Sequence, residues 1–227
     1  MSEAPRLPYA DRREAGRVLA SSVSHLAGRA GLLVLGLPRG GVPVAFEVAR
    51  MLRAPLNVFV VRKLGFPGHE EFAMGAIASG GVRVMNPLPG LHVKPADVDR
   101  VVAREQAELR RREHLYRGDA PPPVLAGRIV VIVDDGLATG ATMRAAALAV
   151  RQQNPALLCI ATPVGAVESC AALQGVADEV HCTARPVPFR AVGLWYRDFP
   201  QTTDGEVRQC LAEAQAWLAV PAEGSTP

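Results

Sequence analysis

The sequence has almost no excess of charge. Lys and Arg number 25, Asp and Glu number 22, and the net charge is +3. Such a small excess excludes the basic field of a dedicated nucleic-acid binder but suits a protein that binds anionic metabolites. No apolar run approaches the length that spans a bilayer, and residues 1–10 lack the basic-then-apolar pattern of a secretion signal. We therefore predict a cytoplasmic protein with no membrane partner, and we do not expect nucleic acid as a partner.

Cysteine, histidine and aromatic residues are also scarce. The four cysteines show no spacing typical of metal ligands or redox pairs, so we expect buried, reduced thiols. Four of the five histidines show no clustering that suggests a role: His25, His92, His114 and His181. Aromatic residues make up 5% of the chain, and we find no internal repeat.

One stretch carries most of the chemical information. Ile129–Val133 is a run of five branched apolar residues, typical of a strand buried on both faces of a parallel sheet. Asp134 and Asp135 end the strand, because two carboxylates followed by small residues cannot continue it. The Ala-rich segment 141–150 then predicts a helix. The sequence therefore predicts a site at the carboxyl end of a parallel strand, where open α/β sheets bind ligands.

The loop between strand and helix suits a phosphate monoester. Backbone N–H groups of residues 138–142 lie at the amino end of the predicted helix, and Thr139 and Thr142 add hydroxyl donors. Gly140 lets the backbone approach the phosphate closely. Asp134 and Asp135 are out of place beside a phosphate unless they bind neutral hydroxyls or a metal. A phosphorylated sugar, with or without Mg²⁺, supplies both partners.

The rest of the chain alternates strands with helices. The predicted strands are Leu32–Leu37, Asn57–Val61, Leu157–Ala161 and Glu179–Thr183, with a hairpin of Gly75–Ser79 and Val82–Asn86. The predicted helices are 11–27, Val42–Leu52, Asp97–Tyr116, one near Ala166–Leu173 and one after Thr203. This order predicts an α/β fold with a doubly wound, mostly parallel sheet. We expect a single domain 1–227, with a core at 30–185, a C-terminal hood at 186–204, a helix at 204–219 and a disordered tail at 221–227.

The segment 129–142 resembles the phosphoribosyl pyrophosphate signature of type I phosphoribosyltransferases, with Ala141 where many members have a second Gly. In that family the loop after the first core strand binds pyrophosphate, and Arg39, Gly40 and Gly41 match its position. Arg62 and Lys63 resemble the pair that serves the pyrophosphate in adenine phosphoribosyltransferases. Family members also carry a mobile loop before the signature strand, whereas this sequence predicts a charged helix there.

The resemblance implies transfer of a 5-phosphoribosyl group from phosphoribosyl pyrophosphate to a nitrogen of a base, weakly favouring a purine, with Mg²⁺ as cofactor and a homodimer as assembly. The implied catalytic residues are Asp134, Asp135, Arg39 and Lys63, and the two aspartates serve the metal indirectly, through ribose or water. The implied substrate-binding residues are Gly40, Gly41, Arg62, Gly136, Leu137, Ala138, Thr139, Gly140, Ala141 and Thr142.

Several alternatives stay open. The acidic pair also fits a solvated strand end or the Asp of a nucleotide triphosphatase, and the loop at 38–41 also fits a plain turn. The whole fold also fits a regulatory protein that senses phosphoribosyl pyrophosphate or a nucleotide without turnover; a phosphoribosyl pyrophosphate synthase-like kinase has no supporting ATP motif. His69, Glu70 and Glu71 are candidates for a general base or for solvated residues. The hood either stacks on a planar acceptor or seals the sheet edge, and the arginines of 100–117 either clamp phosphate or form surface ion pairs.

Overall fold

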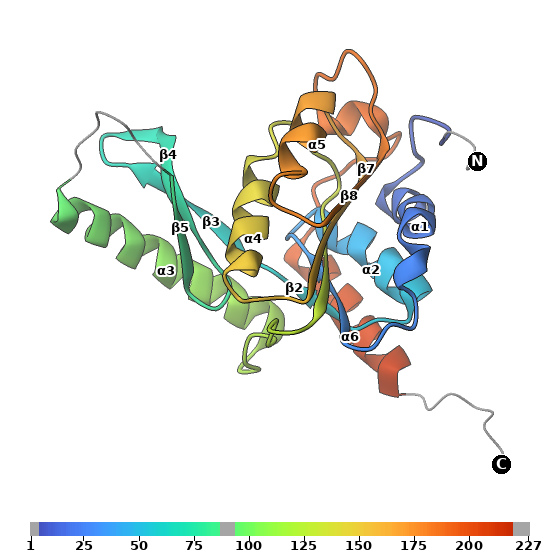
Figure 1. The fold of residues 1–227 in the computed structure, drawn as a ribbon, viewed down its shortest axis with the longest axis horizontal. Coiled ribbons are helices and arrows are strands. Elements are labelled where there is room, and N and C mark those ends of the chain that lie inside the picture. Colours follow the sequence, from blue (N-terminus) through green and yellow to red (C-terminus); the bar gives the residue numbers. More distant parts are fainter. Residues whose placement is uncertain (1–4, 87–93, 220–227) are drawn as a thin grey trace.

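A computed structural model describes residues 5–86 and 94–219, and its centre is a parallel five-stranded sheet (Figure 1). The strands, in spatial order, are β2 (Leu56–Val58), β1 (Leu32–Gly36), β6 (Ile129–Val133), β7 (Leu157–Val164) and β8 (Glu179–Ala184). Every residue of β1 and β6 is buried, as their continuous apolar composition predicts. The predicted doubly wound α/β fold is confirmed.

Helices cover both faces of this sheet. On one face lie α1 (Arg12–Ser22), α2 (Gly41–Leu52) and α6 (Asp204–Ala219), which pack on alternate strand residues such as Val131 and Val133. On the other face lie α4 (Ala141–Arg151) and α5 (Val167–Leu173), which pack on Val130 and Ile132. Successive strand side chains point to opposite faces, so each strand contributes to two cores.

Local capping signals fix the starts of two helices. The Asp11 carboxylate accepts a hydrogen bond from the N–H of Glu14 at 2.7 Å, and Thr203 and Glu206 cap each other's backbone N–H at the start of α6. The first helix ends at Ser22 rather than at residue 27, and the 3₁₀ turn η1 (Ser24–Leu26) follows it.

A second, antiparallel sheet stands beside the first. It comprises β3 (Val61–Phe66), β4 (His69–Ala78) and β5 (Val82–Met85), in that order, and α3 (Pro95–Arg117) lies along it (Figure 1). The predicted hairpin is confirmed: β4 and β5 pair around Gly80 and Gly81, which both have positive φ.

The prediction of one strand over 57–61 was wrong. The parallel ladder ends where Phe59 N–H donates to the Gly36 carbonyl at 3.0 Å. The next residue, Val60, instead bonds Ser79 of the antiparallel sheet, its N–H donating to the hydroxyl at 2.9 Å. Because Phe59 and Val60 are both buried, an unbroken apolar run crosses from one sheet into the other.

Helix α3 packs through a few apolar residues and carries ion pairs on its surface. Val102, Leu109 and Tyr116 are buried against the core. Arg111 and Arg112 both bind Glu108 at 2.8 Å, and Arg117 binds Glu113 at 2.7 Å. Arg111 and Arg112 therefore have partners within their own helix, as the surface interpretation expects, whereas the Arg117 side chain is only 7% exposed.

The remaining predictions concern the cysteines and the chain ends. All four cysteines are free; three are buried and Cys182 is partly exposed. None of the helices over 5–86 and 94–219 has the length and apolar character needed to cross a bilayer. The predicted disordered tail lies outside the described residues.

Candidate functional site

The acidic pair lies at the carboxyl end of β6, in the middle of the parallel sheet. Asp134 turns back on the chain, so that its Oδ1 accepts the backbone N–H of Asp135 at 2.9 Å. Both carboxylates are mostly covered by neighbouring atoms, and the Asp135 side chain keeps 16% of its surface exposed. Two neighbouring carboxylates that are mostly shielded from solvent favour partners that supply hydroxyl donors or positive charge.

The loop after the pair presents free N–H groups at the amino end of α4. Gly140 has φ +69°, and the N–H groups of Ala138, Thr139 and Gly140 donate to no other described residue. The Ser169 hydroxyl of α5 holds the loop from below by donating to the Ala138 carbonyl at 2.6 Å. Exposed N–H groups at a helix amino end form a cradle for an anion.

One residue of the predicted cradle faces the other way. The Leu137 side chain is buried, its N–H donates to the Val164 carbonyl at 2.9 Å, and its carbonyl accepts from Ala166 at 2.9 Å. These bonds anchor the loop to the end of β7. Leu137 thus has no backbone donor left for a ligand, which corrects its prediction as a substrate-binding residue.

The loop between β1 and α2 presses directly on the acidic pair. A methyl group at Gly40 would lie 2.1 Å from Asp135 Oδ2, and one at Gly41 would lie 2.8 Å from the Asp134 Cα. The peptide bond between Pro38 and Arg39 is cis. This contact brings together two of the segments that the sequence predicts for the site.

Arg39 is partly exposed at the rim of this loop. Its Nη1 lies 4.0 Å from Asp204 Oδ1 at the start of α6, and the Tyr116 hydroxyl donates to the same oxygen at 2.6 Å. Burial, then the bond to Asp204, raises the pKa of Tyr116 to about 12, so the hydroxyl keeps its proton at neutral pH. Arg39 thus lies where α2, α3 and α6 meet.

Arg62 and Lys63 do not stand at the end of a parallel strand, which corrects the sequence prediction. They lie inside β3, so their side chains point to opposite faces of the antiparallel sheet. Arg62 binds the buried Glu105 of α3 through Nε at 3.0 Å and Nη2 at 2.7 Å. Because of this ion pair, Arg62 helps to pack α3 on the antiparallel sheet and does not lie beside the acidic pair.

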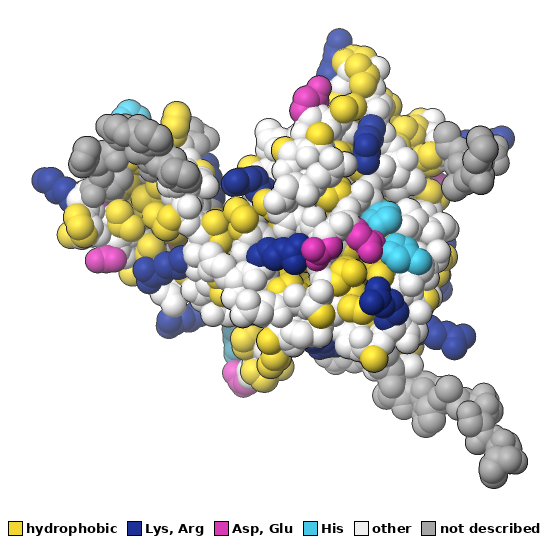
Figure 2. All heavy atoms as spheres, in the orientation of Figure 1, with side chains coloured by type: hydrophobic (Ala, Val, Ile, Leu, Met, Phe, Trp, Pro, Cys, Tyr) yellow, Lys and Arg dark blue, Asp and Glu magenta, His cyan; other side chains and the backbone are white. Residues whose placement is uncertain are grey.

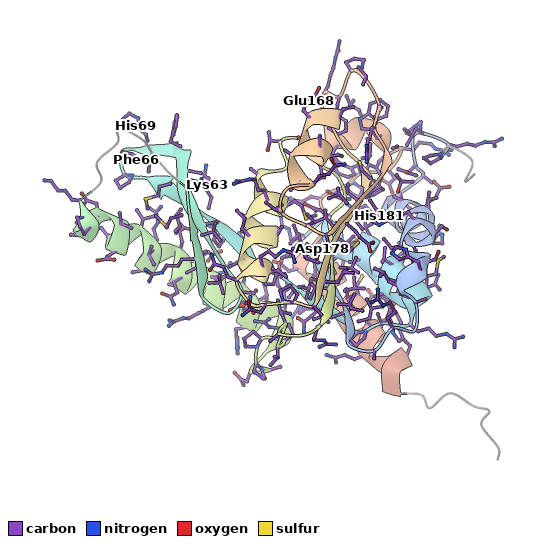
Figure 3. The ribbon with its side chains drawn as sticks, viewed as in Figure 1. Lys63, Phe66, His69, Glu168, Asp178 and His181 are labelled. Atoms are coloured by element: carbon purple, nitrogen blue, oxygen red, sulfur yellow. The ribbon has the colours of Figure 1, made fainter. Side chains whose placement is uncertain are left out.

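Lys63 lies on the side that faces α4 (Figure 3). It lines a cavity of about 210 Å³ together with Asn86, Thr142 and Arg144, between the antiparallel sheet and the start of α4. The structure thus places Lys63 next to the end of the anion cradle. His69 lies farther out on β4, exposed, with its ring 6.3 Å from that of Phe66. The side chains of Glu70 and Glu71 lie outside the described residues.

Arg12 is the site residue that sequence reasoning missed. Its Nε donates to Asp135 Oδ2 at 2.8 Å, its Nη1 donates to the Pro200 carbonyl at 2.7 Å, and its guanidinium carbon lies 3.8 Å from the centre of the Phe199 ring. Only 11% of the Arg12 side chain is exposed. The first helix was predicted from its apolar face alone. The only signal in the sequence for a role of Arg12 was the presence of a cation in the first turn of that helix.

The hood also contacts the acidic pair. The Tyr196 hydroxyl donates to the Asp135 carbonyl at 2.5 Å, and its ring stacks on Phe199 with centroids 4.8 Å apart. Val192 covers Gly136, where a methyl group would lie 2.5 Å from Val192 Cγ1. A parallel bridge joins Tyr196 to Tyr9, so the hood is fixed to the segment before α1. These contacts agree with the sealing role, whereas Leu194 stays exposed.

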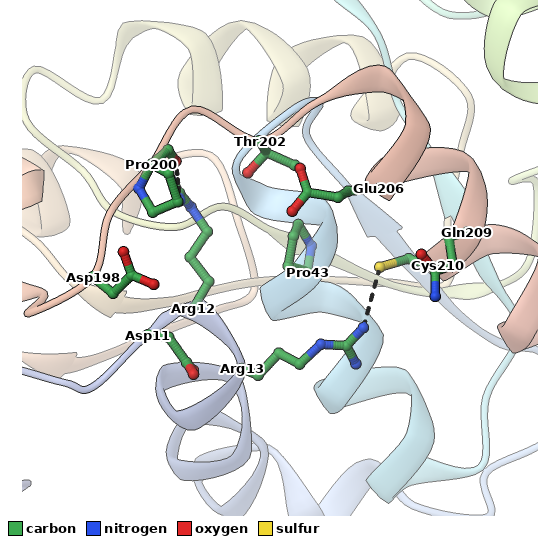
Figure 4. Close-up of a pocket in the computed structure, with 10 residues that line it drawn as sticks. All are labelled: Asp11, Arg12, Arg13, Pro43, Asp198, Pro200, Thr202, Glu206, Gln209 and Cys210. Carbon is green, nitrogen blue, oxygen red and sulfur yellow. Dashed lines mark hydrogen bonds between the residues drawn. The ribbon is translucent and has the colours of Figure 1, made fainter.

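A cavity of about 280 Å³ opens beside Arg12 (Figure 4). Its lining combines the start of α1, Pro43 of α2, the end of the hood and the start of α6. In the close-up, Arg12 points toward Pro200, while Arg13 points toward Cys210, with Nη2 3.9 Å from Sγ. Arg12 therefore separates this cavity from the acidic pair.

The two carboxylates are difficult to ionise together. Burial, and then the neighbouring Asp135, raises the pKa of Asp134 well above its ordinary value, against the opposing effect of the Asp135 N–H and Arg12. Burial also raises the pKa of Asp135, although Arg12 partly offsets this. A ligand that brings hydroxyl donors or a cation would lower the free-energy cost of ionising both carboxylates.

We expect Asp134→Asn to stabilise the ligand-free protein at neutral pH. The folded protein holds the Asp134 proton to higher pH than the unfolded chain does. Stability is therefore lost as the pH rises from about 4, the ordinary Asp value, through the folded pKa. The variant lacks this loss, so urea unfolding should show a gain at pH 7.5 that disappears near pH 4. Asp119→Asn, on a fully exposed side chain, is the control. Equal stability of variant and wild type at every pH would contradict the expectation.

Comparisons with known proteins match most of the chain. A family model described as phosphoribosyl transferase domain matches residues 11–185. Two Mycobacterium tuberculosis proteins with the provisional name phosphoribosyl transferase are each 50% identical over 208 residues, which is 91% of this chain and 47% of each relative. This chain thus spans about half the length of those curated relatives.

Solved structures show the same fold. A crystal structure of a Thermus thermophilus protein matches with a TM-score of 0.82 and 43% identity, covering 91% of this chain and 99% of that chain. A Neisseria gonorrhoeae protein solved with bound ppGpp has a TM-score of 0.50 and 13% identity, covering 94% of this chain and 99% of that chain. At that identity the second likeness concerns the fold alone.

Proposed function

Because this chain belongs to the phosphoribosyltransferase family, we propose that it transfers the 5-phosphoribosyl group of phosphoribosyl pyrophosphate to a nitrogen of a base and releases pyrophosphate. The observation that carries the proposal is the convergence of three groups at one sheet edge. The acidic pair, the free N–H groups of 138–140 and the Gly40-Gly41 loop meet at the carboxyl ends of β1 and β6. The acidic pair can bind the ribose hydroxyls, the free N–H groups the 5-phosphate, and the Gly40-Gly41 loop the pyrophosphate.

In this proposal catalysis is positional and electrostatic. Within the loop 136–142, the N–H groups of residues 138–140 and the hydroxyls of Thr139 and Thr142 hold the 5-phosphate. Asp134 and Asp135 fix the ribose hydroxyls and stabilise positive charge on the sugar as the bond to pyrophosphate breaks. Arg39 and Lys63 take up negative charge on the leaving group. No covalent intermediate with a side chain is needed.

The residues present fit a magnesium ion. Carboxylate oxygens are the ligands that Mg²⁺ prefers, and the raised pKa of Asp134 shows that its burial disfavours an uncompensated negative charge. Asp134 and Asp135 would hold the ion indirectly, through ribose or water. When bound, Mg²⁺ supplies charge neutralisation to the pyrophosphate.

The acceptor, assembly and location complete the proposal. A purine is weakly favoured as the acceptor. This preference rests on the likeness of Lys63 to the adenine-type pair, because Arg62 is bound to Glu105 and the stacked Tyr196 and Phe199 rings are used in covering Asp135. We further propose a cytoplasmic homodimer in which the 1–227 chain works as one domain.

The test is a calorimetric titration of phosphoribosyl pyrophosphate with Mg²⁺ into the protein. We expect saturable binding to one site per chain, because the cradle, the acidic pair and the Gly40-Gly41 loop would engage the 5-phosphate, the ribose and the pyrophosphate of one ligand. The titration is repeated with ribose 5-phosphate, which lacks the pyrophosphate and should bind more weakly. Absence of binding by folded wild-type protein would remove the proposed function.

One observation favours a second candidate, a sensor that binds the same ligand without turnover. Arg12 already occupies Asp135 and ties it to the hood at Pro200, so a ligand that takes over Asp135 would also disturb the hood. Binding followed by pyrophosphate release with any base supports the enzyme. Binding with no release across purines, pyrimidines, nicotinate and ammonia supports the sensor.

A further inference from the structure

Two histidines that are far apart in the sequence converge on one glutamate. His25 lies in η1, and Glu179 and His181 lie on β8. His25 Nε2 is 2.9 Å and His181 Nε2 is 3.0 Å from the same oxygen, Glu179 Oε2. Neither histidine has a role that the sequence alone predicts, because 154 residues separate His25 from Glu179.

The sheet register explains this convergence. Glu179 and His181 are two residues apart on an edge strand, so their side chains share one face. Glu179 pairs in register with Cys159 and His181 with Ala161, and those β7 residues face the core beneath α1 and α2. The turn after α1 then brings His25 over the same face. Figure 2 shows two adjacent histidine side chains beside an acidic one, on the face where Figure 3 labels His181.

The three side chains offer a ligand set suited to zinc. One nitrogen from each imidazole and one carboxylate oxygen lie within 4.8 Å of one another. Zinc binds such nitrogen and oxygen atoms tetrahedrally at about 2.0–2.2 Å, which sets neighbouring ligand atoms roughly 3.3 Å apart. The two separations to Glu179 Oε2 are shorter by only a few tenths of an ångström, and the two imidazole nitrogens lie within 4.8 Å of each other, so side-chain rotations can bring all three atoms onto one ion.

Exposure leaves room for the rest of the coordination shell. The side chains of His25, Glu179 and His181 are 49%, 28% and 26% exposed, so water can occupy a fourth position. A plain ion pair would need only one histidine for this carboxylate, and two protonated imidazoles side by side would repel each other. A divalent cation between all three groups satisfies both histidines in their neutral form.

We propose that His25, Glu179 and His181 form a zinc site, separate from the acidic pair, that fastens η1 to the edge strand β8. The site lies beyond the carboxyl end of α1, whereas Arg12 lies at the amino end of that helix. An 11-residue helix separates the two by roughly 16 Å. The ion would tie the N-terminal part of the chain to the last strand of the sheet.

The test is a titration of ZnCl₂ into protein freed of metal with a chelator, followed by calorimetry and thermal unfolding. We expect one high-affinity zinc per chain and a midpoint of unfolding that rises with zinc. Co²⁺ in place of zinc should give the visible absorption of a tetrahedral site. Mg²⁺ alone should not reproduce these changes, because it prefers an all-oxygen shell.

Matched variants locate the ion. His25→Ala and His181→Ala should each weaken zinc binding by roughly tenfold or more, since even losing a ligand's outer partner typically costs 10–100-fold. His114→Ala, on a side chain that is 70% exposed elsewhere, should bind zinc like the wild type. Glu179→Gln keeps the shape of the side chain but removes its negative charge. It should also weaken zinc binding, and it serves as the test variant if either histidine variant folds poorly. Zinc affinity unchanged in the His25→Ala/His181→Ala double variant, or no zinc binding by the wild type, would overturn the proposal.

Discussion

Replacing Asp134 and Asp135 together by Asn will lower the rate of pyrophosphate release by about 10³-fold or more. The protein should stay folded. Removing a single preorganised electrostatic group commonly costs 10²–10³ in rate, and this change removes both carboxylates that we propose to face the sugar. Asn matches Asp in size, and its side-chain oxygen can still accept the Asp135 N–H at the position of Asp134 Oδ1. Release is measured with phosphoribosyl pyrophosphate, Mg²⁺ and a panel of bases.

Two controls separate loss of chemistry from loss of structure. Thermal unfolding of the double variant should still show one cooperative transition, because relief of the buried Asp134 charge offsets part of what the loss of the Arg12–Asp135 ion pair costs. Asp119→Asn, on a fully exposed carboxylate, should keep full activity. Full activity in the double variant would overturn the role given to the acidic pair.

Gly41→Ala should destabilise the protein and weaken ligand binding at the same time. The new methyl group would lie 2.8 Å from the Asp134 Cα and from the Val133 carbonyl, which are backbone atoms that cannot rotate away. Such overpacking costs about 1–3 kcal/mol and would push α2 away from the end of β6. The free energy of unfolding in urea and the affinity for phosphoribosyl pyrophosphate measure the two effects.

Gly175→Ala is the matched control, because a methyl group there would meet nothing within 4 Å. We expect that variant to unfold and to bind as the wild type does. A Gly41→Ala protein with wild-type stability and affinity would show that the loop at 38–41 does not need its close contact with β6.

The sequence predicts those structural features that depend only on residues close together in the chain. Ile129–Val133 reveals β6 because a strand buried on both faces must be apolar throughout, and Asp134 marks its end because charge cannot continue into the core. The caps at Asp11 and Thr203 are equally local, since capping joins residues only three apart.

The features that escaped prediction depend on pairing between distant segments. Nothing near Arg12 indicates that its partner is Asp135, because 123 residues separate them and a cation in a first turn is commonplace. Arg62 and Lys63 looked equivalent as neighbours at a predicted strand end, but after Phe59 the chain enters the second sheet and places both inside β3, where successive side chains point to opposite faces. A continuous apolar run carries no sign of which sheet its residues join.

The contacts of Arg12 also bear on when the crevice exists during synthesis of the chain. Its guanidinium reaches Asp135 and the Pro200 carbonyl, 188 residues farther along, so the ring of contacts closes only after the hood has emerged from the ribosome. Until then Arg12 and Tyr9 lack their hood partners, and Asp135 lacks the Tyr196 hydroxyl. A nascent chain that has completed β6 through α5 therefore has the groups that anchor this loop before the hood contacts of Arg12 and Asp135 can form. Those contacts follow only when residues 196–200 have been made.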